Sequence, residues 1–161
     1  MYEDIRAFRG NILNLYRVLA NQPLALRAFM TMSRYVRDES TLPPHVRELA
    51  ILVTAYTLDV DYEKVHHLAA ARRAGIPESK LQAVPNWAAS PVYDPPERAV
   101  MTYADQVART RRISDSTFNA LLQHLSPKQI VDLAVTVGWY HFCAAIILSL
   151  GVETEDSGST Q

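Results

Sequence analysis

A carboxylate and an imidazole lie four residues apart in an alanine-rich segment, at Glu63 and His67. Residues at positions i and i+4 share one face of an α-helix, so both side chains can act on the same small volume. Imidazole titrates near neutral pH, and a neighbouring carboxylate can orient it and raise its pKa, which suits proton transfer. The spacing therefore predicts an acid/base site with Glu63 and His67 as candidate catalytic residues.

The elements that must position this pair are helices. The segment that carries it ends at Gly75, a typical C-terminal cap, and Pro77 prevents the helix from continuing. Apolar residues recur at helical spacing elsewhere, and no alternating strand pattern is found, so we expect an all-α fold. Residues 84–96 contain four prolines and are expected to form a loop. Further helices are expected at residues 3–20, 23–37, 44–56, 97–109, 114–124 and 127–150.

The bulk composition excludes several classes of protein. The 161 residues are enough for one domain, and 16 basic against 17 acidic residues, without a long run of either, predict no nucleic-acid-binding surface. The single cysteine, Cys143, excludes an intrachain disulfide framework and any CxxC redox or zinc motif. The acidic start of the chain lacks the pattern of a secretion signal, so a cytoplasmic protein is expected.

Residues 133–150 form the most apolar stretch, at the lower length limit for a membrane-spanning helix. The stretch includes Gly138 and His141, follows Asp132 directly and has no basic cluster beside it. Since a helix that is apolar all round also forms the centre of a soluble helical core, we expect no membrane association. The excess of apolar surface predicts a homo-oligomer instead.

Several motifs at fixed offsets resemble a known family. The sequence RELAIL at residues 47–52 is followed by YE at residues 62–63, by His67 and by ARRAG at residues 71–75. With these motifs, and with GWYHF at residues 138–142, the chain resembles the carboxymuconolactone decarboxylase / alkylhydroperoxidase D-like superfamily.

The resemblance covers roughly residues 40–152 and implies an architecture. We expect an alkylhydroperoxidase D-like helical bundle that forms trimers or hexamers, with the site near a subunit interface. We expect a single domain at residues 1–152 with its core motif at residues 40–125, followed by a flexible tail at residues 153–161.

The resemblance also implies roles for residues. Glu48 falls where the peroxidase branch of the superfamily has its proton-relay glutamate, and His67 falls on the family histidine. Where that branch has CxxC, this chain has Val60 and Glu63. Dithiol peroxide reduction requires a thiolate and a resolving thiol, and Cys143 lies far along an apolar helix, so this chemistry is not expected.

In the decarboxylase branch, Glu63 and His67 match the family's glutamate and histidine. This implies cofactor-free proton transfer to a small carboxylated or lactone-like substrate. Loss of CO2 leaves an enolate-like carbanion that needs a proton donor. We expect His67 to be the general acid/base, with Glu48 or Glu63 holding its tautomer.

Alternatives remain open at this point. The chain could be a peroxiredoxin-like antioxidant protein that uses Cys143, or a non-catalytic oligomeric binding protein with the same fold. In structural terms, His67 could be a core histidine bonded to a carbonyl, Glu63 a surface partner of Lys64, and Glu48 an exposed carboxylate. His66 points about 100° away from its neighbour and is expected to be peripheral.

The histidines lack metal-ligand spacing and the glycines form no phosphate loop, so neither a metal nor another cofactor is expected.

Overall fold

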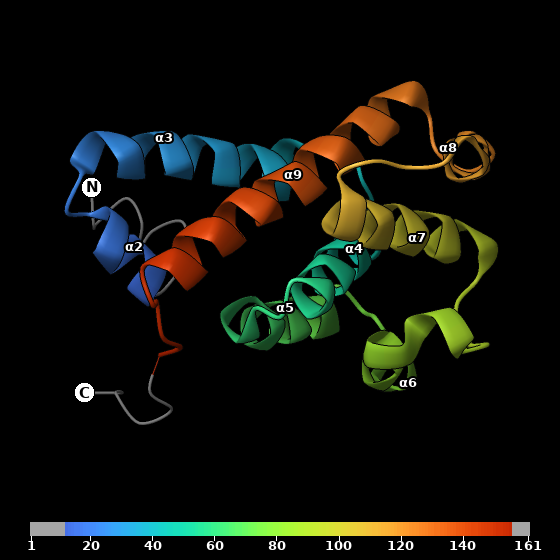
Figure 1. The fold of residues 1–161 in the computed structure, drawn as a ribbon, viewed down its shortest axis with the longest axis horizontal. Helices are drawn as coiled ribbons and strands as arrows, with labels where there is room; N and C mark the ends of the chain where they lie inside the picture. The colour runs from blue at the N-terminus through green and yellow to red at the C-terminus, as the bar shows by residue number, and fades with distance from the viewer. Residues whose placement is uncertain (1–11, 156–161) are drawn as a thin grey trace.

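The structure is a computed structural model that describes residues 12–155, and within that range it contains helices and no strand (Figure 1). The predicted all-α fold is therefore confirmed. A π-helical turn, η1 (Tyr35–Glu39), and a 3-10 helix, η2 (Val84–Ala89), accompany the α-helices. The α-helices are α2 (Asn14–Leu19), α3 (Pro23–Arg34), α4 (Pro44–Thr57), α5 (Asp61–Arg73), α6 (Glu78–Ala83), α7 (Pro95–Thr110), α8 (Asp115–Leu122) and α9 (Pro127–Ser149).

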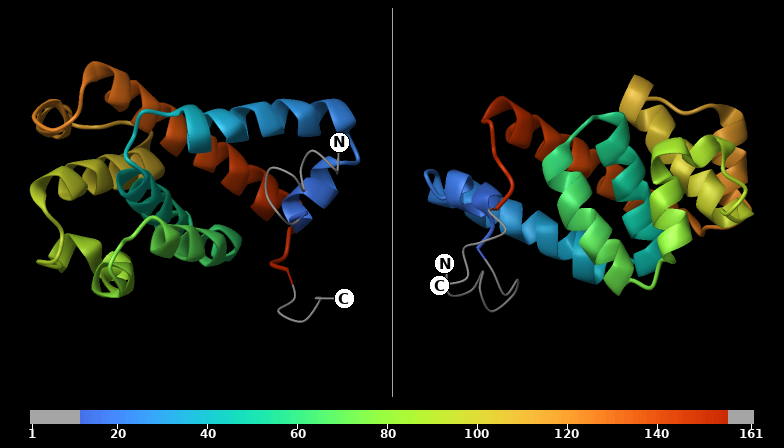
Figure 2. Two further views of the ribbon diagram at one scale, coloured as in Figure 1. Left: turned by 180° about the vertical axis from the view of Figure 1, so that it is seen from behind. Right: turned by 90° about the horizontal axis from the view of Figure 1, so that it is seen from below.

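Helix α4 is the centre of the fold. Every residue from position 48 to position 55 is buried, and the helix packs against α5, α7 and α9. A helix that is apolar all round needs partners on every side, which explains its place inside the bundle. Figures 1 and 2 show α4 enclosed by these helices.

Helix α9 crosses the molecule along this core. It begins as predicted with a capping box, in which Ser126 accepts from the Gln129 amide and Gln129 from the Ser126 amide, and Gly151 follows its end at a positive φ of 61°. By length and composition alone, α9 would qualify as a membrane span, but half of its most apolar stretch is buried inside the protein. It packs as a core helix, against α4, α7 and η1.

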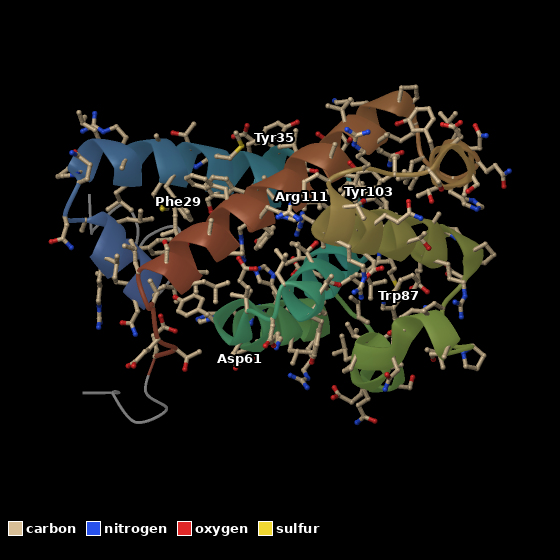
Figure 3. All side chains as sticks on the ribbon, in the orientation of Figure 1. Phe29, Tyr35, Asp61, Trp87, Tyr103 and Arg111 are labelled. Carbon is tan, nitrogen blue, oxygen red and sulfur yellow. The ribbon has the colours of Figure 1, made fainter. Side chains whose placement is uncertain are left out.

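Among the described residues, two large apolar cores flank the middle of α9, where Val36, Ile51 and Tyr140 form a smaller buried cluster. One lies among α4 to α8 and the first half of α9, with Leu49, Met101 and Leu133 fully buried. The other lies between α2, α3, the start of α5 and the second half of α9, around Leu26 and Phe29. Figure 3 shows Phe29 in the space between α3 and α9. Helix α5 contributes residues to both cores.

A buried carboxylate, Asp132, ties the first core to the segment after α3. It accepts hydrogen bonds from the Tyr35 hydroxyl at 2.5 Å and from the Thr41 amide at 2.7 Å, and the Thr41 hydroxyl donates as well. Burial alone would raise the pKa of Asp132, but these donors and the charge of Lys128 hold it below its usual value. The contact fixes η1 against α9.

Two local predictions are wrong in detail. A continuous helix over residues 3–20 is interrupted, because Leu13 is extended, with φ −69° and ψ 153°, and α2 begins only at Asn14; residues 1–11 lie outside the described range. The segment predicted to be a loop at residues 84–96 starts with η2, because its Pro85 suits a first helical turn. Of the predicted tail, residues 156–161 lie outside the described range.

Candidate active site

Helices α4 and α5 bring Glu48 and His67 into direct contact. The Nδ1 atom of His67 lies 2.7 Å from Oε2 of Glu48, and the two residues are 5% and 2% exposed. Glu48 is thus no exposed carboxylate, and His67 is bonded to a carboxylate rather than to a backbone carbonyl.

The environment sets the protonation of this pair. Burial disfavours both charged forms; for Glu48 the charge and hydrogen bond of His67, together with the charges of Arg47 and Arg37, outweigh it and lower the pKa. For His67, burial prevails over the influence of Glu48 and lowers the pKa. At neutral pH Glu48 is a carboxylate and His67 a neutral imidazole that donates from Nδ1, which leaves Nε2 as the basic nitrogen.

Arg47 supports Glu48 from the preceding position of α4. Its Nε lies 3.5 Å from Oε1 of Glu48, and its Nη1 donates to the backbone carbonyl of Arg37 at 2.8 Å. The guanidinium therefore joins the middle of η1 to Glu48 and helps to keep this carboxylate ionised.

Glu63 has the opposite character, although it lies one turn before His67 on α5. It is 3% exposed, and neither carboxyl oxygen bonds to any of residues 12–155. Burial without a compensating partner raises its pKa to about 8, so at pH 7 Glu63 carries a proton. The idea that Glu63 pairs with Lys64 on the surface is wrong, since Lys64 instead binds Asp59 and Asp61.

Glu63 and His67 line the same cavity, which has a volume of about 170 Å³. Its wall comes from α2, α3, η1, α5 and α9, and so it lies beside the second apolar core. Besides Glu63 and His67, the polar lining consists of Ser33, Arg37, His66 and Arg73. The apolar lining includes Leu15, Tyr16, Phe29, Trp139, Tyr140 and Ile147.

Aromatic rings fix the shape of this cavity. The Tyr140 ring stands edge-on to the His67 ring at a centroid distance of 4.7 Å and an angle of 89°. Phe29 and Trp139 lie 4.5 Å apart between centroids. Burial raises the pKa of Tyr140 well above its ordinary value, so its phenol is neutral. The wall is suited to a flat, mainly apolar ring.

Cys143 also lines the cavity, which sequence reasoning did not foresee. It is 3% exposed and lies one turn after Tyr140 on α9. The helical spacing of Tyr140, Cys143 and Ile147 was the available signal, because residues three, four and seven apart share a face.

His66 is less peripheral than expected, because it also lines the cavity and holds the last described residue. Its Nε2 lies 2.7 Å from Oε2 of Glu155. The other oxygen of Glu155 accepts from the Tyr62 hydroxyl at 2.9 Å and from the Asn14 amide at 2.6 Å. One carboxylate thereby joins α2 to α5 at the edge of the cavity.

The described residues contain no group of three or more His, Cys, Asp or Glu side chains arranged to hold a metal ion. The cavity lining itself supplies Glu63 and His67, which can transfer protons, and the thiol of Cys143.

Comparison with known proteins shows which family the sequence matches. The sequence model of the carboxymuconolactone decarboxylase family matches residues 23–106, slightly more than half of the chain. The uncharacterized protein YdfG of Bacillus subtilis (strain 168) is 21% identical over 131 residues, which are 80% of this chain and 88% of YdfG.

Solved structures share the fold. A protein of unknown function from Agrobacterium tumefaciens, for which a role as the antioxidant defence protein AhpD has been suggested, has a TM-score of 0.79 and 22% identity over 86% of this chain and 95% of its own. The debrominase Bmp8, in a cysteine-to-alanine variant complexed with 2,3,4-tribromopyrrole, has a TM-score of 0.84 and 16% identity over 94% of this chain and 82% of its own. At these identities the likeness shows the fold alone.

Proposed function

The chain belongs to the carboxymuconolactone decarboxylase family, and from this premise we propose that it is a cofactor-free acid/base enzyme. In this proposal the substrate is a small carboxylated or lactone-like ring, and the reaction is loss of CO2 followed by proton transfer to carbon. The observation that carries the proposal is the presence of a protonated carboxyl group, Glu63, and a carboxylate-bound imidazole, His67, in one cavity.

Glu63 is the proton donor. When the bond to the substrate carboxylate breaks, CO2 leaves and the electron pair remains on carbon as an enolate-like carbanion. Glu63 transfers its proton to that carbon and becomes a carboxylate. The proton that His67 has taken from the substrate carboxyl group then returns through water to Glu63, whose acid form burial favours, and both residues regain their starting states. This role differs from the sequence-based expectation for His67, because a neutral imidazole that donates Nδ1–H to Glu48 has no proton at Nε2 to give.

His67 is the base that prepares the substrate. Burial and the nearby negative charge of Glu48 raise the pKa of a substrate carboxyl group and so favour its protonated form. CO2 cannot leave from that form. The Nε2 atom of His67 accepts that proton, and the resulting imidazolium is stabilised by Glu48. Glu48 is therefore a positioning residue that acts through His67.

The test is release of CO2 from a panel of carboxylated lactones and β-keto acids. Replacement of Glu63 by Gln keeps the shape but removes the proton, and we expect kcat to fall by roughly 10²–10⁴-fold. The matched control is Glu39→Gln, at an exposed position of η1. A folded Glu63→Gln protein with full turnover would refute the assignment.

One observation favours a second candidate function, that of an antioxidant protein: Cys143 shares the cavity with His67. In this reaction a thiolate attacks a peroxide oxygen, the O–O bond breaks, the alcohol leaves and a sulfenic acid forms. A small thiol must then reduce the sulfenic acid, since the chain has no second cysteine. Unchanged peroxide consumption by Cys143→Ser would remove this candidate.

The third candidate, a binding protein without turnover, would be indicated by ligand binding that is insensitive to changes at Glu48 and His67.

In each case we propose a homo-oligomer, either a trimer or a hexamer. Support comes from exposed apolar side chains toward the end of α9: Phe142 and Leu148 are 50% and 56% exposed, and Leu150, the C-cap residue, is 60% exposed. A monomeric mass in solution at micromolar concentration would contradict this. The cytoplasmic location stays a prediction.

A further inference from the structure

The cavity holds a proton donor and a proton acceptor at the same time, one turn apart on α5. Glu63 presents a carboxyl group with no protein partner among residues 12–155, and His67 is held by Glu48 through Nδ1. Side chains at positions i and i+4 have Cβ atoms about 5–6 Å apart. That separation suits two groups that contact the two ends of one C–C=O unit, the acceptor at the α-carbon hydrogen and the donor at the oxygen.

We propose that the site also enolises small neutral cyclic ketones, with Nε2 of His67 removing the α-proton and the Glu63 carboxyl group protonating the carbonyl oxygen. The inference rests on the acid/base site of the proposed function, but it requires no carboxylate on the substrate. It adds an isomerisation activity to the proposed decarboxylation.

The step is balanced without a co-reactant. The α-C–H bond breaks, its electron pair forms the C=C bond, and the π electrons of the carbonyl bond take up the proton of Glu63 as O–H. His67 is then an imidazolium beside the Glu48 carboxylate, and Glu63 is a carboxylate. In a β,γ-unsaturated ketone, the imidazolium returns its proton to the γ-carbon while Glu63 recovers its own from the enol. The product is the conjugated ketone.

The dimensions of the cavity and the aromatic part of its wall support this substrate class. An apolar cavity of about 150 Å³ can hold benzene, so one of about 170 Å³ accommodates a six-membered ring. The rings of Phe29, Trp139 and Tyr140 form its apolar wall. A neutral ketone brings no charge into the buried surroundings of Glu48, so its entry avoids the large penalty of burying an ion.

Glu48 makes the base effective despite its burial. Burial favours neutral His67, but the carboxylate 2.7 Å from Nδ1 favours the imidazolium that forms when Nε2 takes a proton. Charge therefore develops next to a fixed counter-charge, an arrangement that lowers the barrier to proton abstraction.

The experiment follows cyclohex-3-en-1-one in D2O by proton NMR, with the full-length protein. We expect enzyme-dependent exchange of the α-protons and formation of cyclohex-2-en-1-one. Glu63→Gln and His67→Gln should each lower the rate by roughly 10²-fold or more. The exposed residues Glu39 and His45 provide matched controls, and Glu39→Gln and His45→Gln should retain the full rate.

A β-keto acid is assayed for CO2 release in parallel, and circular dichroism checks that each variant is folded. Exchange that depends on both residues supports the inference, with or without CO2 release. CO2 release without exchange overturns the inference and leaves the proposed function standing. Silence in both assays overturns both, and exchange that survives in folded Glu63→Gln and His67→Gln assigns it to other groups.

Discussion

The Nδ1 atom of His67 lies 2.7 Å from Oε2 of Glu48, so the basic half of the site is a contact between two helices. Glu48 belongs to α4, the most buried helix, and its neighbours on every side restrict its movement. The imidazole is thereby held in one tautomer at one place, while Glu63, one turn away on α5, has no such partner in the part of the chain that the structure describes. Four predictions follow from this arrangement and from its supports.

Replacement of Glu48 by Gln should lower the pKa of His67 further. Both the charge of Glu48 and its hydrogen bond favour the imidazolium, and an amide supplies no charge. Turnover should fall by roughly 10²–10⁴-fold, because the base loses its counter-charge. Titration of the His67 ring protons by NMR measures the shift, with Glu39→Gln as the control. A His67 titration unchanged by the substitution would show that the contact is not maintained in solution.

Glu63 should make the protein less stable as the pH rises from about 4.5 to about 8. In the unfolded chain the carboxyl group loses its proton near 4.5, while in the folded protein it keeps the proton up to about 8. The unfolded state therefore binds fewer protons in this window, and the free energy of unfolding falls by up to about 1.4 kcal/mol per pH unit.

The substitution Glu63→Gln should remove this dependence, because an amide does not titrate. Urea unfolding at pH 5 and pH 8 measures it, and the variant should gain stability relative to the wild type at the higher pH. If the free energies of unfolding of the wild type and of Glu63→Gln differ by the same amount at pH 5 and at pH 8, Glu63 titrates normally in the folded protein.

Asp132→Asn should destabilise the fold by about 1–3 kcal/mol. The Tyr35 hydroxyl, the Thr41 amide and the Thr41 hydroxyl all donate to this carboxylate. The side-chain amide of Asn replaces one acceptor oxygen with a further donor. Chemical denaturation measures the loss, and Asp38→Asn at an exposed position is the control. A loss under about 0.5 kcal/mol, the range of ordinary surface changes, would contradict a structural role for Asp132.

Glu155→Ala should expose the cavity by releasing α2 from α5. The carboxylate bonds to Asn14, Tyr62 and His66, and a hydrogen bond to a charged group contributes about 1.5–3 kcal/mol. The reaction of Cys143 with a thiol reagent reports the opening, since this residue is 3% exposed in the closed state. We expect labelling to be faster by roughly tenfold or more, in line with about 1.4 kcal/mol per factor of ten.

The matched control for this labelling experiment is Glu153→Ala. The hydrogen bond between Asn14 and Glu153 uses the backbone oxygen of Glu153, so removal of the Glu153 side chain should not affect opening. Equal labelling rates in the wild type and Glu155→Ala would show that Glu155 does not close the cavity.

Local elements were predictable because their signals lie within a few residues. The start of α9 is an example: Ser126 and Gln129 satisfy each other's backbone amides across a single turn, so neighbouring residues suffice to set the helix start. The start of α2 was missed, because the signal is distant. Its first amide, that of Asn14, is bonded by Glu155, 141 residues away.

The grouping of Glu48, Glu63 and His67 was also predictable, from helical spacing and from motifs at fixed offsets. Their separate roles were not. Spacing places two groups on a helix face, whereas a pKa depends on burial and on charges brought in by other helices.

The sequence by itself determined the all-helical class, the main helix starts and the three candidate residues, since each depends on periodicity, caps or short motifs. Tertiary structure alone decided that Glu48 binds His67, that Glu63 has no hydrogen-bond partner among the described residues, and that Cys143 shares a cavity with Glu63 and His67. The physical reason is that hydrogen-bond partners and desolvation arise where α4 and α5 pack together and against α9, a helix that is far from both in the chain.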